Sequence, residues 1–416
     1  MEFSEIKLQK TRSAFLWTNI LRAPFWAVYN LLLFILYKDL HATPFQLALF
    51  IALKPTVSLL SMYWSAHINK RPDRLLSNVV WAGVIGYLPF LFFPFFYNAW
   101  FVLFASSLFM MMFRGVVPAW MEIFKLNLPG ETKQKVFAYG SIVSYIVGAI
   151  LPILIGPMLD LYALSWRYFF AASALLGLTA ILFQVRIPID YNKVVGKENT
   201  LVTSLATTFL APWKNAWKIM REHKGFRNYQ IGFMMFAGAG LMIMQPALPC
   251  FFIDALGLSY TELSIALTLC KGCGFALTSP LWAKWLGKLN IYRISCVVTF
   301  LAALFPLILL TAQWHIFWIY LAYLAYGVMQ AGSELSWHLS GPIFAKEEDS
   351  SSFSSVNILT VGLRGCLIPQ IGSLLCLMIS STSILLCGAT LCLMGTFWMV
   401  FIAGKQALQH EFKHVG

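Results

Sequence analysis

The sequence predicts an all-α integral membrane protein whose twelve transmembrane helices form two pseudo-symmetric six-helix bundles. Three observations lead to this prediction. Hydrophobic residues make up 59% of the 416 residues and charged residues only 11%, whereas a soluble domain carries about 25% charged residues. The apolar runs are about 20 residues long, which is the length of a membrane-spanning helix. The two halves of the chain also resemble each other at a fixed spacing.

Each expected span is an apolar run bounded by polar or turn-forming residues. The alternating ten-residue pattern of a membrane β-strand is not seen. The twelve spans are expected at residues 14–37, 44–67, 75–97, 99–121, 136–158, 165–185, 229–253, 259–282, 292–311, 314–337, 353–378 and 382–403.

One long polar break divides these spans into six and six. We therefore expect an N-terminal six-helix bundle at 1–185, a cytoplasmic central loop at 186–228 and a C-terminal six-helix bundle at 229–416. Within the loop, Trp213 and Trp217 are one helical turn apart, and basic residues share their spacing on an adjacent face. This pattern predicts an amphipathic helix that lies at the membrane interface.

The placement of lysine and arginine predicts the orientation in the membrane. If the N-terminus is cytoplasmic, the cytoplasmic segments hold 23 of the 30 basic residues, and the opposite side holds only Lys38 and Arg167. Because cytoplasmic loops of membrane proteins are enriched in these residues, we expect both termini in the cytoplasm. The net charge of +13 then reflects topology, and no nucleic-acid site is predicted.

An internal repeat relates the two halves at an offset of 216 residues. The segment Thr43–Leu47 falls on Ser259–Leu263, at the start of the second and eighth spans. The segment Val136–Gly156 falls on 352–372, in the fifth and eleventh spans. One constant offset indicates a duplication, and parallel repeats of this kind place a substrate site at the repeat interface near the membrane midplane.

With twelve spans, two parallel halves and a basic central loop, the whole chain resembles the major facilitator superfamily. The segment Ser65–Arg74 stands where that family's loop between helices 2 and 3 reads G-x-x-x-D-R-x-G-R-R. It keeps the basic character of the loop, while Ser65, Asn69 and Pro72 replace the first glycine, the aspartate and the second glycine.

The fifth span carries a second fragment of the family pattern. Gly148 and the pair Gly156-Pro157 are similar to the antiporter motif that ends in G-P-x-x-G-G, but Asp160 and Leu161 stand where its final glycines would be. The resemblance implies a transporter fold. In that fold helices 1, 4, 7 and 10 line a cavity, helices 2, 5, 8 and 11 frame it, and helices 3, 6, 9 and 12 face lipid.

Charged side chains inside the expected spans are few, and such charges usually mark functional sites because burying them in a bilayer is costly. In the repeat, Arg22 falls on Gly238 and Arg364 falls on Gly148, so each pair is charged in only one half. A single asymmetric solute would require this, and drift after duplication is the alternative. The charged set consists of the cations Arg22, Lys54, Arg114, Lys271 and Arg364, the carboxylate Glu334, and His338 one helical turn further on.

Five cations against one carboxylate predict a site for an anion, because a charge in a low-dielectric interior needs a partner. The forked donors of arginine suit carboxylate and phosphate groups. We therefore predict that the five cations bind a small anionic organic solute. Glu334, together with His338, is predicted to take up and release the proton that couples transport to the proton gradient.

The same residues have structural alternatives. Lys54 and Lys271 could extend their ammonium groups toward the membrane surface. Arg364 could serve only to hold a bend in its helix. Glu334 could form a fixed ion pair with Arg114 or with Arg364.

These inferences predict a proton-coupled secondary transporter, by symport, that works by alternating access. A proton-coupled drug exporter is one alternative, favoured by the Gly156-Pro157 fragment, and a non-transporting membrane receptor on the same fold is another. No enzyme is expected, because the spans contain no paired carboxylates and no nucleophile with a base. The sequence has no G-x-x-x-x-G-K-[ST] loop, so ATP is not the expected energy source.

We expect no cofactor and no bound metal. Cys270 and Cys273 form a C-x-x-C, but it lies within an apolar span, where cysteine usually acts as a small apolar residue. The expected partners are the solute, protons and the lipid bilayer. We expect a monomer in the inner (cell) membrane.

Overall fold

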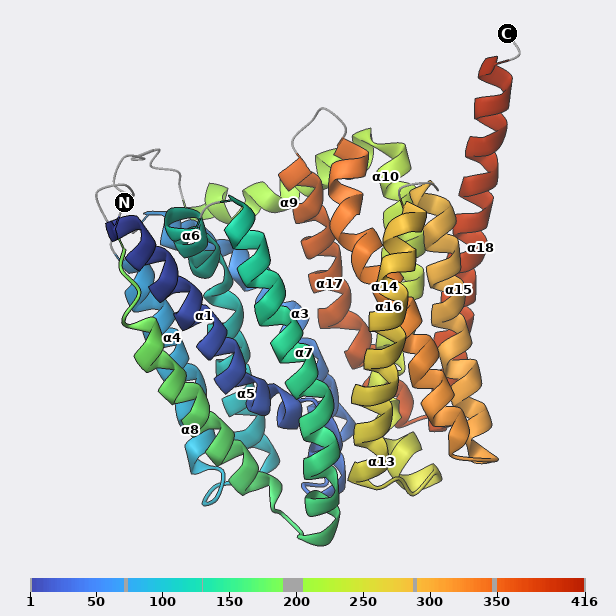
Figure 1. The fold of residues 1–416 in the computed structure, drawn as a ribbon. Coiled ribbons are helices and arrows are strands. Elements are labelled where there is room, and N and C mark those ends of the chain that lie inside the picture. The colour runs from blue at the N-terminus through green and yellow to red at the C-terminus, as the bar shows by residue number, and fades with distance from the viewer. Residues whose placement is uncertain are drawn as a thin grey trace. The chain divides into compact units, whose positions relative to one another are not determined.

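The computed structural model describes residues 2–70, 74–128, 130–189, 205–286, 290–345 and 350–414, and every regular element in these ranges is a helix (Figure 1). The chain divides into two compact units. Unit 1 consists of Met1–Gln46, Val57–Val202 and Ser259–Ser264. Unit 2 consists of Leu47–Thr56, Thr203–Leu258 and Ile265–Gly416.

The protein is a multi-pass membrane protein, as the apolar runs predicted. Among the described residues, eight helices are long and apolar enough to cross a membrane, and three shorter apolar helices lie at Pro44–Val57, Ala99–Gly115 and Ile146–Leu161. Together they fall on all the expected spans except the tenth. That span is the single helix α16 (Phe317–Ala345), in which polar side chains such as Gln330 and Glu334 interrupt the apolar surface.

Unit 1 is built mainly from the first half of the sequence, and α1 packs against both α7 and α8. Its first expected span is broken, because α1 ends at Tyr29 and a new helix begins at Leu32. The helices of unit 1 are α1 (Glu2–Tyr29), α2 (Leu32–Lys38), both ends of α3 (Pro44–Lys70), α4 (Leu75–Tyr87), η2 (Leu88–Phe92), α5 (Ala99–Gly115), α6 (Val117–Asn127), α7 (Gly130–Leu161), α8 (Trp166–Gln184) and α13 (Tyr260–Ser264).

An aromatic cluster fixes the position of α1 within unit 1. The ring of Phe25 is fully buried, and its centroid lies 5.1 Å from that of Tyr87, 4.7 Å from that of Phe90 and 4.5 Å from that of Phe109. Such ring pairs add to the free energy gained from burying the rings themselves. The cluster thereby holds α1 against α4 and α5 and sets the direction of the side chain of Arg22, one helical turn earlier.

Unit 2 contains most of the second half of the sequence, and α15 packs against both α16 and α18. Three of its elements are π-helical, namely η4, η6 and η7, and such wide turns often occur at functional sites. The helices of unit 2 are α9 (Leu205–Glu222), α10 (Lys224–Tyr229), η4 (Gln230–Ala237), α11 (Gly238–Ile243), η5 (Gln245–Ala247), α12 (Leu248–Cys250), η6 (Phe251–Ala255), η7 (Ile265–Cys270), α14 (Lys271–Leu286), α15 (Ile291–Leu310), η8 (Thr311–Gln313), α16, α17 (Ser350–Cys376) and α18 (Ser381–His414). The helix expected around Trp213 and Trp217 is α9.

The offset of 216 residues reappears in the helix starts and in their caps. The helices α3 and α13 begin at Pro44 and Tyr260. Before α3, the backbone N–H of Thr43 donates to Oε1 of Gln46 at 2.8 Å. Before α13, the backbone N–H of Ser259 donates to Oε2 of Glu262, also at 2.8 Å. Both are capping boxes, in which a side chain three residues on satisfies the first backbone donor.

Asp160 ties α13 to the end of α7 inside unit 1. Its Oδ1 accepts from the backbone N–H of Tyr260 at 2.8 Å, and its Oδ2 accepts from the N–H and the hydroxyl of Thr261 at 3.0 and 2.6 Å. A carboxylate suits this position, because the first N–H groups of a helix lack partners within the helix. Gly156, one turn earlier, leaves room for the backbone of Thr261, which a Cβ would approach to 2.9 Å.

Candidate functional site

The structure distributes the seven sequence-predicted site residues over both units. Among them, Lys271 and Glu334 interact electrostatically with each other. Arg22 and Arg114 belong to unit 1, whereas Lys54, Lys271, Glu334, His338 and Arg364 belong to unit 2.

Lys271 and Glu334 lie on neighbouring helices of unit 2, α14 and α16. Lys271 is the first residue of α14, directly after the π-helical η7, and its ammonium interacts electrostatically with the carboxylate of Glu334 on α16. Oε1 of Glu334 accepts a hydrogen bond from Nε2 of Gln330, one turn earlier, at 3.1 Å. Lys271 and Glu334 are therefore close enough for their charges to interact, and the suggested ion pair of Glu334 with Arg114 or Arg364 stays a prediction.

His338 lies one helical turn beyond Glu334 on α16, as its spacing indicated. Its side chain is exposed, and its ring meets that of Trp337 edge to face with centroids 4.6 Å apart.

Arg364 is held by a backbone carbonyl of another helix. Its Nη1 donates to the carbonyl oxygen of Met234, which lies in the π-helical η4. Its Nε is buried and has no hydrogen-bond partner among the described residues. The guanidinium lies directly against Gly238, where even a methyl group would overlap it. Arg364 thus connects α17 to η4 and α11.

Lys54 lies beside the contact that joins α3 to α17 within unit 2. Its side chain is exposed. The next residue, Pro55, packs closely on Gly365, and the hydroxyl of Thr56 lies 3.0 Å from the thiol of Cys366. Lys54 and Arg364 therefore each stand one residue before the same helix contact.

Arg114 is half-buried near the end of α5. Its Nε is buried and has no hydrogen-bond partner among the described residues. A buried guanidinium donor without a partner is unusual, because such groups are almost always satisfied. Arg114 is therefore a candidate for contact with a bound group.

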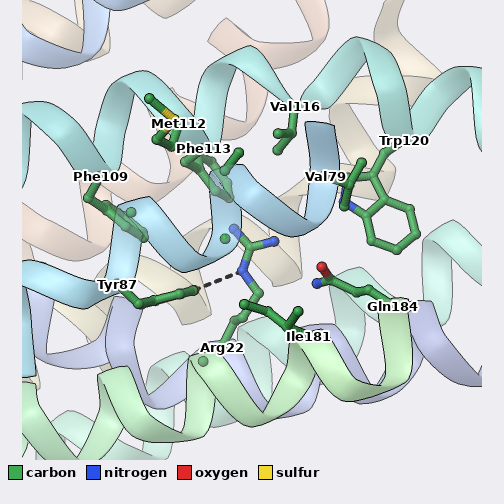
Figure 2. A pocket seen from close by; sticks show the side chains of 14 residues that line it. Arg22, Val79, Tyr87, Phe109, Met112, Phe113, Val116, Trp120, Ile181 and Gln184 are labelled. Carbon is green, nitrogen blue, oxygen red and sulfur yellow. Dashed lines mark hydrogen bonds between the residues drawn. The ribbon is translucent and has the colours of Figure 1, made fainter. Parts of the chain in front are cut away.

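Arg22 points into a cavity of unit 1 (Figure 2). Its Nε donates to the hydroxyl of Tyr87 at 2.9 Å, and its guanidinium carbon lies 4.8 Å from the centre of the Phe113 ring. Figure 2 shows the guanidinium with Tyr87 on one side and Gln184 on the other. The cavity has a volume of about 20 Å³, which is room for one or two water-sized molecules.

The sequence analysis missed Tyr87 and Gln184. Both belong to spans that the family resemblance assigns to the lipid-facing class, yet both side chains are buried, with 3% and 4% of their surface exposed. Nε2 of Gln184 donates to the hydroxyl of Thr18 at 3.2 Å, and its Oε1 has no hydrogen-bond partner among the described residues. An amide in an apolar span was the only signal in the sequence that could have pointed to this site.

The two thiols of the C-x-x-C are free, and Cys270 is half-buried whereas Cys273 is exposed. Among the described residues, no group of three histidine, cysteine, aspartate or glutamate side chains could hold a metal ion.

Outside the spans, Asp39 is the acidic residue with the most altered surroundings. Burial raises the pKa of its carboxyl above the ordinary value of 3.8, and the Tyr260 hydroxyl, the Lys38 ammonium, the Trp166 indole and His41 oppose this effect in part. The Lys38 ammonium also lies 4.5 Å from the centre of the Tyr260 ring. Asp39 therefore adds a titratable group beside the α13 turn that Asp160 holds.

Comparisons with known proteins agree on one fold. The model of the Major Facilitator Superfamily matches residues 15–369. A POT family transporter, solved in complex with 5-aminolevulinic acid, superimposes with a TM-score of 0.71 at 12% identity and covers 95% of this chain and 96% of its own. The nucleoside transporter NupG superimposes with a TM-score of 0.70 at 13% identity and covers 94% of this chain and 98% of its own. No curated protein matches the sequence as a relative.

The contact between Arg364 and Gly238 predicts an unequal response of two glycines to the same substitution. Gly238→Ala places a methyl group where the guanidinium lies, and we expect it to lower the free energy of unfolding by about 1–3 kcal/mol. Gly148→Ala is the matched control, because the 216-residue offset places Gly148 on Arg364 and a Cβ at Gly148 meets no atom within 4 Å. Thermal unfolding of the purified variants measures both effects. Equal stability of the two variants would refute the close packing.

The raised pKa of Asp39 predicts a pH dependence of stability. A carboxyl whose pKa is higher in the folded protein favours folding at low pH, and this contribution is lost as pH rises from the ordinary value of 3.8 through the raised one. Asp39→Asn has no carboxyl to titrate at this position. Its melting temperature should therefore rise relative to that of the wild type as pH increases from about 4 to about 7. Glu222→Gln, at an exposed position, is the control. A constant difference between Asp39→Asn and wild type across this range would contradict the prediction.

Proposed function

Because the chain belongs to the major facilitator superfamily, we propose that this secondary transporter carries a small anionic organic solute, coupled to protons, by alternating access. The observation that supports the proposal is the packing of α14 on α16, which brings Lys271 within electrostatic range of Glu334, the carboxylate found within the expected spans. Arg22, Lys54, Arg114 and Arg364 add four further positive charges to the spans. A solute that moves through such an interior is stabilised if it is negatively charged.

The pair suggests how protons and solute are coupled. While Glu334 is ionised, its charge compensates that of Lys271, and the ammonium has little attraction left for an anion. When Glu334 takes up a proton, the charge of Lys271 is uncompensated and attracts the solute. Proton and anion then bind together, which is the requirement for symport.

His338 and Gln330 support this role from the same helix. Gln330 donates to Glu334, and this bond fixes the orientation of the carboxyl group. His338 is exposed one turn further on, and we propose that it passes protons to and from Glu334.

Arg364 in unit 2 and Arg114 in unit 1 are each proposed to contact an anionic solute. Each has a buried Nε without a partner among the described residues, and a guanidinium can offer two parallel donors to a carboxylate or phosphate. Lys54 lies on α3 beside the contact of Pro55 with Gly365 of α17. It is proposed to add a positive charge close to that contact.

The orientation belongs to the proposal as well. The distribution of basic residues, 23 on one side against two on the other, supports cytoplasmic termini in the inner (cell) membrane. The solved POT family transporter that binds 5-aminolevulinic acid suggests small amino and keto acids as the first compounds to examine.

Uptake into proteoliposomes tests the proposal. A panel of carboxylates and phosphate esters, led by 5-aminolevulinic acid, is offered with and without an inward proton gradient. We expect at least one anion to accumulate with the gradient. Glu334→Gln should lose gradient-driven accumulation but retain exchange of labelled for unlabelled solute, because a neutral side chain mimics the protonated state. Arg364→Gln should raise the KM by about tenfold, the loss of one charged hydrogen bond, and Arg364→Lys by less.

Arg293→Gln is the control, because it removes a positive charge from an exposed position of α15 and should leave uptake unchanged. Gradient-driven accumulation by Glu334→Gln at the wild-type level would exclude the proton-coupling role. A preference for lipophilic cations would favour the drug exporter instead, and binding of an anion without any flux would favour a receptor.

A further inference from the structure

The cavity around Arg22 has the features of a binding site that the transport mechanism does not use. It is lined by residues of α1, α4, α5, α6 and α8, all of which belong to unit 1. With a volume of about 20 Å³ it is too small for an organic solute, since pockets for such ligands measure about 300–1,000 Å³. The occupant must therefore be very small.

The polar side chains at this cavity include Arg22, Tyr87 and Gln184. Arg22 has five N–H donors, of which Nε is used for the hydroxyl oxygen of Tyr87. Because that oxygen accepts from Arg22, the phenolic hydrogen of Tyr87 is free to point elsewhere. Gln184 lies on the other side of the guanidinium (Figure 2). Its carboxamide can turn so that Oε1 accepts from the Thr18 hydroxyl and the N–H₂ group faces the cavity, since the two orientations are interchangeable.

The charge of the cavity is not balanced by its lining. Among the described lining residues there is no carboxylate, and the aromatic and aliphatic side chains of Phe113, Trp120 and Ile181 complete the wall. The Phe113 ring stabilises the cation only weakly. A water molecule would satisfy the donors but leave the positive charge uncompensated, and an uncompensated buried charge is costly.

We propose that the Arg22 cavity of unit 1 binds one small inorganic anion of the size of chloride. The anion receives hydrogen bonds from the guanidinium, from the Tyr87 hydroxyl and from the Gln184 amide. It acts as the counter-ion of the Arg22 guanidinium within unit 1.

Equilibrium binding of radioactive chloride to the purified protein tests the site. The buffer anion is gluconate, which is too large for the cavity, and neither solute nor proton gradient is present. We expect one saturable chloride per chain, displaced by bromide but not by gluconate, and a melting temperature that rises with chloride concentration at constant ionic strength. Arg22→Met should abolish both effects.

Two milder variants keep the test decisive if Arg22→Met does not fold. Tyr87→Phe and Gln184→Leu each remove one donor and leave the charge in place, so each should weaken chloride binding by about twofold to tenfold. Arg293→Gln, which removes an exposed charge, should bind chloride like the wild type.

Absence of saturable chloride binding in the wild type would overturn the inference and indicate that the cavity holds water only. Chloride binding that persists unchanged in both Tyr87→Phe and Gln184→Leu would place the anion elsewhere and overturn it as well. Because binding is measured without transport, its failure leaves the proposed function intact, and a protein without uptake can still bind chloride.

Discussion

The constraint that shapes this molecule is the free-energy cost of holding charged side chains inside a membrane. A bilayer offers no solvent to an ammonium or guanidinium group, so each must find a partner within the protein. The partners seen here differ in kind. Lys271 interacts electrostatically with the carboxylate of Glu334, Arg364 donates to the carbonyl of Met234, and Arg22 donates to a phenol. Only the first partner can lose its charge by taking up a proton, which is why the proposed coupling rests on it.

The packing explains an asymmetry that the sequence displays but does not account for. The repeat places Gly238 in the position of Arg22, and the guanidinium of Arg364 lies against that glycine. A side chain at position 238 would therefore compete with Arg364 for the same space. The two halves carry their arginines on different helices of the repeat. In unit 2, the guanidinium of Arg364 leaves no room for a side chain at position 238. This gives a physical reason for the unequal pairs besides drift after duplication.

Much of the fold could be predicted from the sequence, because span length and charge bias act locally. The apolar runs predicted the membrane helices, and the offset predicted the matching starts of α3 and α13 with their capping boxes. The break after Tyr29 and the π-helical turns around Met234 and before Lys271 were not predicted. These features depend on packing between helices, which apolar periodicity does not report.

The candidate site was predicted only in part, for a related reason. Composition identifies which residues are charged, but it does not determine the direction in which a helix presents them. Glu334 was recognised as special, while its partner Lys271 was not chosen over two arginines. Neutral partners of Arg22 such as Tyr87 carry no charge signal, so a search for charged residues passes over them.

The central claim is that Lys271 and Glu334 compensate each other, and a double-mutant cycle measures this directly. The unfolding free energies of Lys271→Met, Glu334→Gln and the double variant are compared with the wild type in the same detergent. The account predicts that each single variant is less stable than the double, with a coupling energy of at least about 1 kcal/mol. Additive effects, with the double variant as unstable as the sum of the two single ones, would contradict it.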